Sequence, residues 1–355
     1  MTTERTIAVP LGILVTISVA VGLYFSAVII APIAGALFII AIVWPIQSRL
    51  QRHLPQLAAL AIVVTLTVAV FAVFGSIVAW GFGRIGRSLL ADAPRFQMLY
   101  DQAANWLEIH GIAVTGLWAE HFDMRWLVRA LQGVSSRLNT MVSFWAVVLV
   151  YVLLGLLEIG PVTRRISAAL DEGTARVLIK GSSLTAAKLR RYMLIRTIMS
   201  ITTGGMVYAL ATALGLQLAA EWGVIAFTLN FIPFVGPFIA TVLPTLYALA
   251  QFESLQSAFV VFAGLNLIQF VIGSYVEPRV AGKALAISPF FVLFSVFLWS
   301  FLWGLFGAFI GVPIAIAGLT FCAQSRSARW LAVLLGASDN DGPEALSAKA
   351  GATDM

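Results

Sequence analysis

Residues 222–250 read WGVIAFTLNFIPFVGPFIATVLPTLYALA, a run of 29 positions that contains no Asp, Glu, Lys or Arg. A helix that crosses the hydrocarbon core of a bilayer needs about 20 apolar residues, so this run is too long for one crossing and too short for two. Pro233, Gly236 and Pro237 divide it into pieces of 11 and 13 residues, and proline interrupts the hydrogen bonding of a helix interior. The stretch therefore predicts two half-helices that fold back on each other as a hairpin.

A second run of this kind covers residues 288–322, and its 35 positions are interrupted by glycine or proline at 304, 307, 311 and 313. An uninterrupted apolar stretch precedes each run, 197–216 before the first and 255–276 before the second. The carboxy-terminal half thus repeats one unit, a full span followed by a broken hairpin. If all basic residues around the two copies lie on one side of the membrane, the copies have opposite orientation. Inverted repeats with discontinuous helices are typical of secondary transporters.

The overall composition excludes a water-soluble domain. Hydrophobic residues make up 60% of the chain and charged residues 11%, against about 45–50% and 25% in soluble domains. Seven stretches of at least 20 residues carry no charged side chain, namely 6–48, 53–83, 138–157, 197–220, 222–252, 254–276 and 284–325. We expect an all-α polytopic membrane protein with about six full spans, two broken or re-entrant helical hairpins in an inverted repeat, and a small helical extramembrane domain.

The positive charges predict the orientation of the chain. The segment 160–196 holds eight basic residues and two acidic ones, and short loops rich in Lys and Arg face the cytoplasm. Both termini are then cytoplasmic, and we expect the chain in the inner (plasma) membrane of a bacterium. The net charge of +6 lies in such loops rather than in one stripe, so a nucleic-acid partner is not expected. The expected partners are the lipid bilayer and a small-molecule or ion substrate.

Hydropathy divides the chain into segments. Pro32 is the expected break between the first two spans, and the near balance of charge in 84–140 suits the external side. The segments are the first three spans (1–83), an external helical domain (84–140), a fourth span (141–159), a basic cytoplasmic segment (160–196), a transport unit with the broken hairpins 222–250 and 288–322 (197–322), and a cytoplasmic tail (323–355) expected to be disordered after residue 337.

The first hairpin carries the candidate binding residues. Pro233 and Pro237 have no N–H group, so the carbonyl groups four residues before each lose a helical partner. Such carbonyls are tolerated at membrane depth only inside protein or beside a water-filled cavity, and the amide of Asn230 can donate and accept hydrogen bonds at the same place. We interpret this tip as a substrate or ion site. The alternative interpretation is a packing kink with a hydrogen-bonded Asn230.

Polar residues on the span 255–276 form a second candidate feature. Four of them are spaced by 3, 4 and 4 positions and share one helical face; they are Asn266, Gln269, Gly273 and Glu277. This face either lines the path of the solute or forms a polar seam between helices. Glu277 and Arg279 carry opposite charges on either side of Pro278 and can pair, either as a cytoplasmic gate or as an interfacial anchor.

The sequence lacks the patterns of familiar enzymes. No HExxH, GxSxG, Walker loop or CxxC occurs in it. We therefore expect no enzymatic activity, no catalytic residue, no metal ligand and no cofactor.

Four blocks in the carboxy-terminal half resemble, in order, motifs of the autoinducer-2 exporter family, also called the PerM-type permeases. Arg191-Tyr-Met193 with Thr197 and Ser200 is similar to the first, and Glu221-Trp-Gly223 leading to Asn230-Phe-Ile-Pro-Phe-Val-Gly236 resembles the family's WG…LNyIPxxG block. Glu277-Pro-Arg-Val-Ala-Gly282 with Leu285, Ser288 and Pro289 resembles EPrvmGxxLxLSP. Trp299 through Gly304, Gly307 and Pro313 resembles WxxlWGxxGxxLxxP, and the whole resemblance covers about residues 185–320.

This resemblance implies an inner-membrane transporter, with export of the quorum signal autoinducer-2 as the named activity. Members with a known structure are pentameric, which implies a homo-oligomer. The candidate substrate- or ion-binding residues are then Asn230, Pro233, Gly236, Pro237, Asn266, Gln269 and Ser288, with Glu277 and Arg279 as the gate. We predict a secondary transporter that exports a small polar, autoinducer-2-like solute by alternating access. The alternatives are a Na⁺(Li⁺)/H⁺ antiporter, an activity described for other members, and a non-transporting membrane scaffold or receptor.

Overall fold

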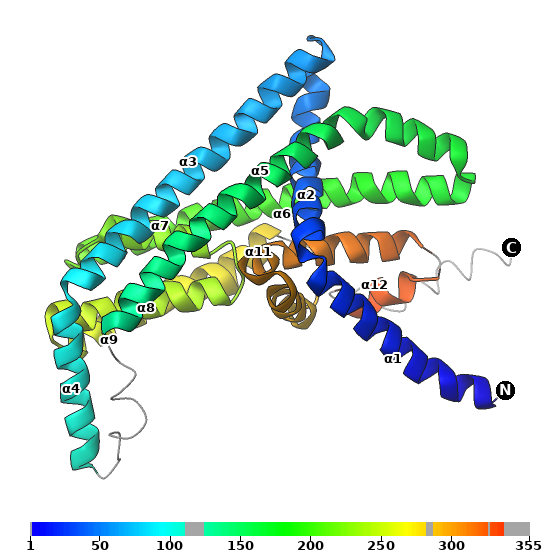
Figure 1. Cartoon of the computed structure of the whole chain (residues 1–355). Coiled ribbons are helices and arrows are strands. Elements are labelled where there is room, and N and C mark those ends of the chain that lie inside the picture. The colour runs from blue at the N-terminus through cyan, green and yellow to red at the C-terminus, as the bar shows by residue number, and fades with distance from the viewer. Residues whose placement is uncertain (1, 111–123, 282–286, 326, 337–355) are drawn as a thin grey trace, which may run out of the picture. The chain divides into compact units, whose positions relative to one another are not determined.

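The computed structural model describes residues 2–110, 124–281, 287–325 and 327–336, and every regular element in them is helical (Figure 1). Parts of three predicted segments lie outside the described residues: 111–123 of the external domain, 282–286 of the third motif, and the tail after residue 336. The helices are α1 (Thr2–Phe25), α2 (Ala27–Leu50), α3 (Gln56–Ala91), α4 (Ala93–Ile109), α5 (Met124–Ala169), α6 (Glu172–Ala213), α7 (Ala219–Leu229), α8 (Val235–Phe252), α9 (Leu255–Phe270), the π-helix η1 (Val271–Val276), α10 (Glu277–Ala281), α11 (Pro289–Gln324) and α12 (Arg329–Leu335).

Seven of the described helices are long and apolar enough to cross a membrane, which confirms the all-α polytopic fold class. They comprise α2, α3, residues 143–169 of α5, α6, α8, α9 with η1, and α11. Two shorter apolar helices, residues 14–25 and α7, complete the set. Each of these helices contains one of the uncharged stretches or part of one, and several extend beyond it into charged sequence.

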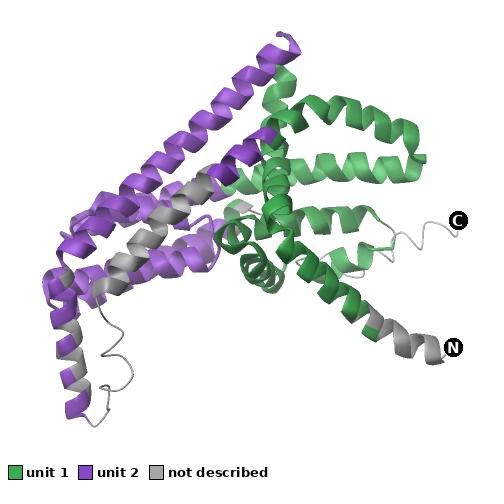
Figure 2. Cartoon of the chain, in the orientation of Figure 1, with its two compact units in different colours: residues 1–53, 151–195, 278–355 green, residues 54–150, 196–277 purple. Residues whose placement is uncertain are grey.

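The chain forms two compact units, and it passes between them four times (Figure 2). Unit 1 contains residues 1–53, 151–195 and 278–355, and unit 2 contains residues 54–150 and 196–277. The crossings within α5 and α6 fall inside continuous helices. This division splits the predicted transport unit 197–322 after Glu277, so that the two broken segments belong to different units.

Unit 1 packs α1, α2 and α11 against one another. The ring of Phe38 on α2 meets that of Phe309 on α11 edge to face, with centroids 5.8 Å apart. Arg190 on α6 donates a hydrogen bond from Nη1 to the Ala41 carbonyl at 2.8 Å, which ties α6 to the backbone of α2.

Unit 2 is built around α7, which packs against α3 and α8, while α8 packs against α9. Phe74 on α3 lies edge to face with both Phe227 and Phe231, at centroid distances of 5.9 and 6.1 Å. Trp222 is 1% exposed, and its ring lies 5.6 Å from that of Tyr247 on α8. Aromatic burial of this kind fixes α7 between its neighbours.

The run 222–250 is a pair of helices, α7 and α8, joined by a turn over residues 230–234, and this pair is the first hairpin. The two helices pack against each other. Gly236 allows their close approach, because a Cβ atom there would overlap the carbonyl group of Leu229. Pro237 lies in the first turn of α8, where its missing N–H leaves no helical hydrogen bond unmade. The predicted broken pair is confirmed, and its re-entry into the bilayer stays a prediction.

A γ-turn at the tip strains the first hairpin. Phe234 has φ 64° and ψ −52°, and the Val235 N–H donates to the Pro233 carbonyl at 2.7 Å. A γ-turn with positive φ is rare and strained in any residue except glycine. The Phe234 side chain is 50% exposed, so burial of its ring does not explain why the turn holds a phenylalanine.

Residues 289–324 form a second hairpin, because α11 reverses at Trp303 and Gly304. Gly304 has φ 62° and ψ −142°, a conformation open to glycine. A Cβ on Gly311 would come within 2.8 Å of the Ser295 carbonyl oxygen, whereas the two residues would be about 24 Å apart along a straight helix. The chain therefore folds back, with the reversal at the first of the four predicted interruptions.

Three helix boundaries differ from those expected. The break between the first two spans falls at Ser26, and Pro32 lies inside α2, which continues beyond it. Residues 124–169 form one helix, so the described end of the external segment, the fourth span and the start of the basic segment are continuous. The turn between α5 and α6 is set by Asp171, whose carboxylate accepts a hydrogen bond from the Thr174 N–H at 2.9 Å, and this hydrogen bond lowers the pKa of Asp171.

We expect the substitution Gly236→Ala to disrupt the first hairpin, because the new methyl group would overlap the Leu229 carbonyl. Overpacking of this kind costs about 1–3 kcal/mol or more. The measurement is the thermal unfolding midpoint of the detergent-solubilised chain. The matched control is Gly205→Ala on α6, where nothing lies within 4 Å of the added Cβ; equal midpoints for the two variants would contradict the packing argument.

Replacing Phe234 with glycine should stabilise the chain, because glycine adopts positive φ without strain and about 1–3 kcal/mol is released. Phe234→Ala removes the same ring but keeps a Cβ atom. The difference between the two unfolding midpoints isolates the backbone contribution. An alanine variant as stable as the glycine variant would show that the turn is not strained.

Candidate functional site

The predicted binding residue Asn230 lies where α7 meets α6. The two backbones touch, because a Cβ on Gly204 would lie 2.7 Å from the Gly223 carbonyl oxygen, and one on Gly223 would lie 2.9 Å from that of Gly204. Glycine permits this approach between membrane helices. The Asn230 Nδ2 donates a hydrogen bond at 3.2 Å to the Oγ of Ser200, which lies one turn before Gly204 on α6. Asn230 is 6% exposed and Ser200 0%.

Further polar atoms lie buried along the same face of α6. Arg196, Ser200 and Thr203 are spaced by 4 and 3 positions and therefore share that face. The Thr203 hydroxyl and the Arg196 Nε are buried and have no hydrogen-bond partner among the described residues. Because buried polar groups are almost always paired in native proteins, a ligand or water is the expected partner. We call Arg196, Ser200, Thr203 and Asn230 the α6–α7 polar cluster.

The two carbonyl groups expected to be freed by proline both have backbone partners. The Leu229 carbonyl accepts a hydrogen bond from the Ile232 N–H at 2.9 Å, and the Pro233 carbonyl accepts one from Val235. The turn therefore closes on itself rather than presenting unpaired oxygens. Pro233 and Gly236 are buried and shape this turn, which leaves side chains as the polar groups that can meet a solute.

Glu277 forms an ion pair with Arg196, a partner that the sequence did not suggest. The Arg196 Nη1 lies 2.7 Å from the Glu277 Oε1, and the two side chains are 8% and 32% exposed. Arg279 is exposed. Sequence inspection missed this pair because Arg196 is one of eight basic residues in its segment, and nothing in that pattern marks it as buried.

A π-helix separates the predicted polar face of α9 into two parts. Residues 271–276 adopt π geometry, and the Glu277 N–H bonds to the Ile272 carbonyl five residues earlier. The wider turn rotates Glu277 away from the face that holds Asn266 and Gln269. Asn266 is exposed, and its amide donates to the carbonyl of Phe262 in its own helix at 2.8 Å. π-Helical turns are frequent at functional sites.

Ser288 is the residue before α11, and it lies in unit 1, whereas Asn230 lies in unit 2. Its backbone N–H donates to the carbonyl of Leu335 at the end of α12, at 3.1 Å. Its position follows from Pro289, which occupies the first turn of α11, a favoured place for proline. The structure thus assigns Ser288 to the start of the second hairpin.

A second ion pair, in which the carboxylate is buried and the arginine is half exposed, lies near the opposite end of α7. Glu221 in its first turn is 3% exposed, and its Oε1 lies 2.9 Å from the Nη1 of Arg84 on α3. The hydroxyl of Tyr247 on α8 lies 3.1 Å from the Ser88 hydroxyl on α3, and it donates a hydrogen bond to the Gln217 Oε1 at 3.3 Å. These polar contacts fasten the first hairpin to α3.

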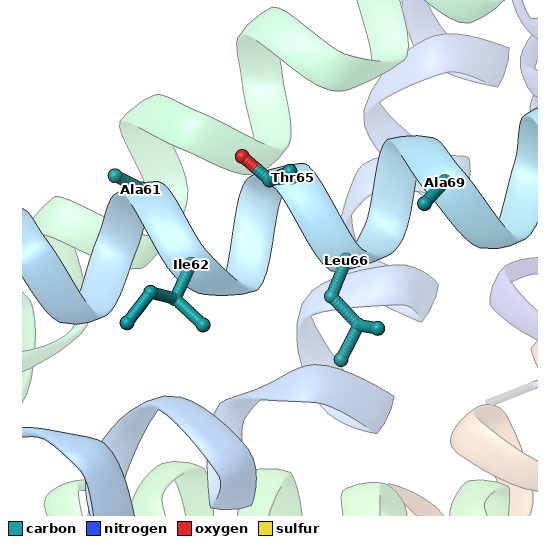
Figure 3. A pocket seen from close by; sticks show the side chains of 5 residues that line it. All are labelled: Ala61, Ile62, Thr65, Leu66 and Ala69. Carbon is teal, nitrogen blue, oxygen red and sulfur yellow. The ribbon is translucent and has the colours of Figure 1, made fainter.

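An apolar depression of about 460 Å³ runs along α3 and is lined by Ala61, Ile62, Thr65, Leu66 and Ala69 (Figure 3). Ile62 and Leu66 are each 47% exposed. Four aliphatic side chains and one hydroxyl suit contact with lipid chains better than with a polar solute. None of the predicted site residues belongs to this lining.

A family model described as AI-2E family transporter matches residues 13–327 of the chain. The AI-2 transport protein TqsA of Escherichia coli K12 is 29% identical over 334 residues, which are 93% of this chain and 95% of TqsA. A transport protein of Haemophilus influenzae is 26% identical over 344 residues, 92% of this chain and 95% of its own length. YhhT of E. coli K12, also named for transport, is 24% identical over 323 residues, 89% and 90% of the two chains.

The matched residues include both hairpins and the α6–α7 polar cluster, and the match extends over the membrane helices from α1 to α11. A transporter of this kind acts on a small molecule or an ion and resides in a lipid bilayer. The chain belongs to the AI-2E family of transporters.

Proposed function

We propose that the chain is a secondary transporter that exports a small polar solute across the inner membrane by alternating access. The observation that carries the proposal is the α6–α7 polar cluster. Asn230 donates a hydrogen bond to Ser200, while Thr203 and Arg196 keep buried polar atoms without a partner among the described residues. The similarity to TqsA, named as an AI-2 transport protein, favours a hydroxylated, autoinducer-2-like molecule. We further propose cytoplasmic termini and a homo-oligomer.

The chemistry of the cluster suits a neutral hydroxylated solute. An amide and two hydroxyl groups each donate and accept hydrogen bonds, so they can exchange their mutual contacts for contacts with a polyol. Glu277 is the carboxylate that contacts the cluster, and its negative charge is balanced by the positive charge of Arg196. The Arg196 Nε remains a donor for an oxygen of the solute.

The Arg196–Glu277 ion pair suits the role of the gate. Arg196 and Glu277 are the first and last residues of their segment of unit 2, so the pair joins two of the four places where the chain passes between units. The adjoining π-helix, in which the Glu277 N–H bonds to the Ile272 carbonyl, is a kind of turn that is frequent at functional sites.

The substitution Asn230→Ala tests the binding role. We expect about a tenfold or larger loss of solute flux in proteoliposomes, seen as a rise in the half-saturating concentration, because one buried hydrogen-bonding group is removed. The probes are autoinducer-2 and a panel of small polyols. Asn105→Ala, at an exposed position on α4, is the matched control. Unchanged flux in the Asn230 variant would refute the site, and a flux loss that merely follows a loss of folded protein would assign Asn230 to packing.

Neutralising Glu277 tests the gate. Glu277→Gln leaves the buried Arg196 guanidinium without its counter-ion, and breaking a buried pair costs about 3–5 kcal/mol, so we expect a lower unfolding midpoint and impaired flux. The charge-swapped double variant Arg196→Glu with Glu277→Arg should recover part of both. Glu253→Gln, at an exposed helix end, is the matched control. Proton flux that is lost together with solute flux would instead favour the antiporter alternative, and a double variant no better than the single one would rule out the pair as the gate.

A further inference from the structure

One exposed face of α6 changes from basic to apolar along its length. The face consists of exposed residues spaced by 4 and 3 positions, with the helical average of 3.6, and its members are Arg176, Lys180, Leu184, Lys188, Arg191, Leu194, Ile198, Ile201, Gly205, Tyr208 and Thr212. The first part holds four basic residues. From Leu194 onward the face carries no charge, and Leu194, Ile198 and Ile201 are 62%, 44% and 60% exposed.

The change between Arg191 and Leu194 marks where α6 enters the hydrocarbon core. Large apolar side chains this exposed are stable against lipid chains but not against water. From Arg191 to Thr212 the helix rises about 32 Å, which matches the roughly 30 Å thickness of the hydrocarbon core. The preceding part of α6, from Glu172 to Arg191, therefore extends beyond the core on the basic side.

Lys188 and Arg191 then lie at the depth of the lipid headgroups. They are one turn apart on the same face, and neither has a carboxylate partner among the described residues. Arg176, by contrast, pairs with Glu172 at 2.5 Å, and Lys180 lies about 17 Å from Arg191 along the helix axis. This distance is about twice the Debye length at physiological salt.

We propose that Lys188 and Arg191 form a binding site for the phosphate of an anionic phospholipid in the leaflet next to the basic segment. Arg191 can bind two phosphate oxygens with its planar guanidinium, and Lys188 adds a second positive charge one turn away. The opposite face of α6 is buried, with Leu189 5% and Ser200 0% exposed, so the helix is held in place while this face meets lipid. The bound lipid fixes the depth of α6, whose buried face carries the α6–α7 polar cluster further along.

The test uses the full chain reconstituted into vesicles of equal parts phosphatidylglycerol and phosphatidylcholine with identical acyl chains. After extraction, native mass spectrometry measures the ratio of the two lipids that remain bound. Each basic side chain near an anionic surface contributes about a factor of five in affinity. We expect the wild-type ratio to exceed about ten, and the double variant Lys188→Gln with Arg191→Gln to bring it near one.

The matched control is the double variant Arg176→Gln with Lys180→Gln, which removes the same charge from the same face farther from the apolar boundary. It should keep most of the wild-type selectivity, and the conservative exchange Lys188→Arg with Arg191→Lys should keep it as well. A wild-type ratio near one, or an equal loss in both neutralised variants, would overturn the proposal. Far-ultraviolet circular dichroism of each variant ensures that a lower ratio comes from a folded helix.

Discussion

A membrane protein has to satisfy every backbone polar group inside the hydrocarbon core without water, and this constraint governs both interruptions of the helices here. At the first hairpin the turn over residues 230–234 pairs the Leu229 and Pro233 carbonyls with nearby N–H groups. At the second, the chain reverses within two residues at Trp303 and Gly304. Gly236 and Gly311 have no side chain, so the two arms of each hairpin can approach each other backbone to backbone. The helices are interrupted, but the Leu229 and Pro233 carbonyls at the first interruption still accept backbone hydrogen bonds.

The same constraint explains what could be predicted from the sequence. An uncharged run that is too long for one membrane crossing and is divided by proline and glycine indicates a hairpin. This signal can be read from the sequence because it lies within one continuous stretch. The partner of Glu277 could not be found in this way. Arg196 lies far from it in the chain, and its burial depends on how α6 packs. The local pattern instead favoured Arg279, the nearest basic residue. The γ-turn at Phe234 was equally invisible, because no sequence rule places positive φ at phenylalanine.

Two of the acidic residues that form ion pairs in unit 2 hold the end of a helix against another helix. Glu221 begins α7 and pairs with Arg84, and Glu277 follows η1 and pairs with Arg196. Burying a carboxylate is costly without a counter-charge, so each pair fixes the position of a helix end against another helix. The predicted gate therefore keeps Glu277 but gains Arg196, and the candidate site gains Ser200 and Thr203 from the same helix. One helix, α6, supplies all three additions.

The two hairpins are alike in topology but differ in chemistry. The tip of the second is anchored by the Trp303 indole, which donates to the Leu23 carbonyl at 3.1 Å, and its sharp turn is relaxed because glycine occupies the positive-φ position. The tip of the first carries a strained phenylalanine four residues after Asn230, whose buried amide donates a hydrogen bond to the Ser200 hydroxyl. Strain persists only where the surrounding structure holds it, and it accumulates at sites that bind or move. We therefore propose that solute recognition belongs to the first hairpin rather than to the second.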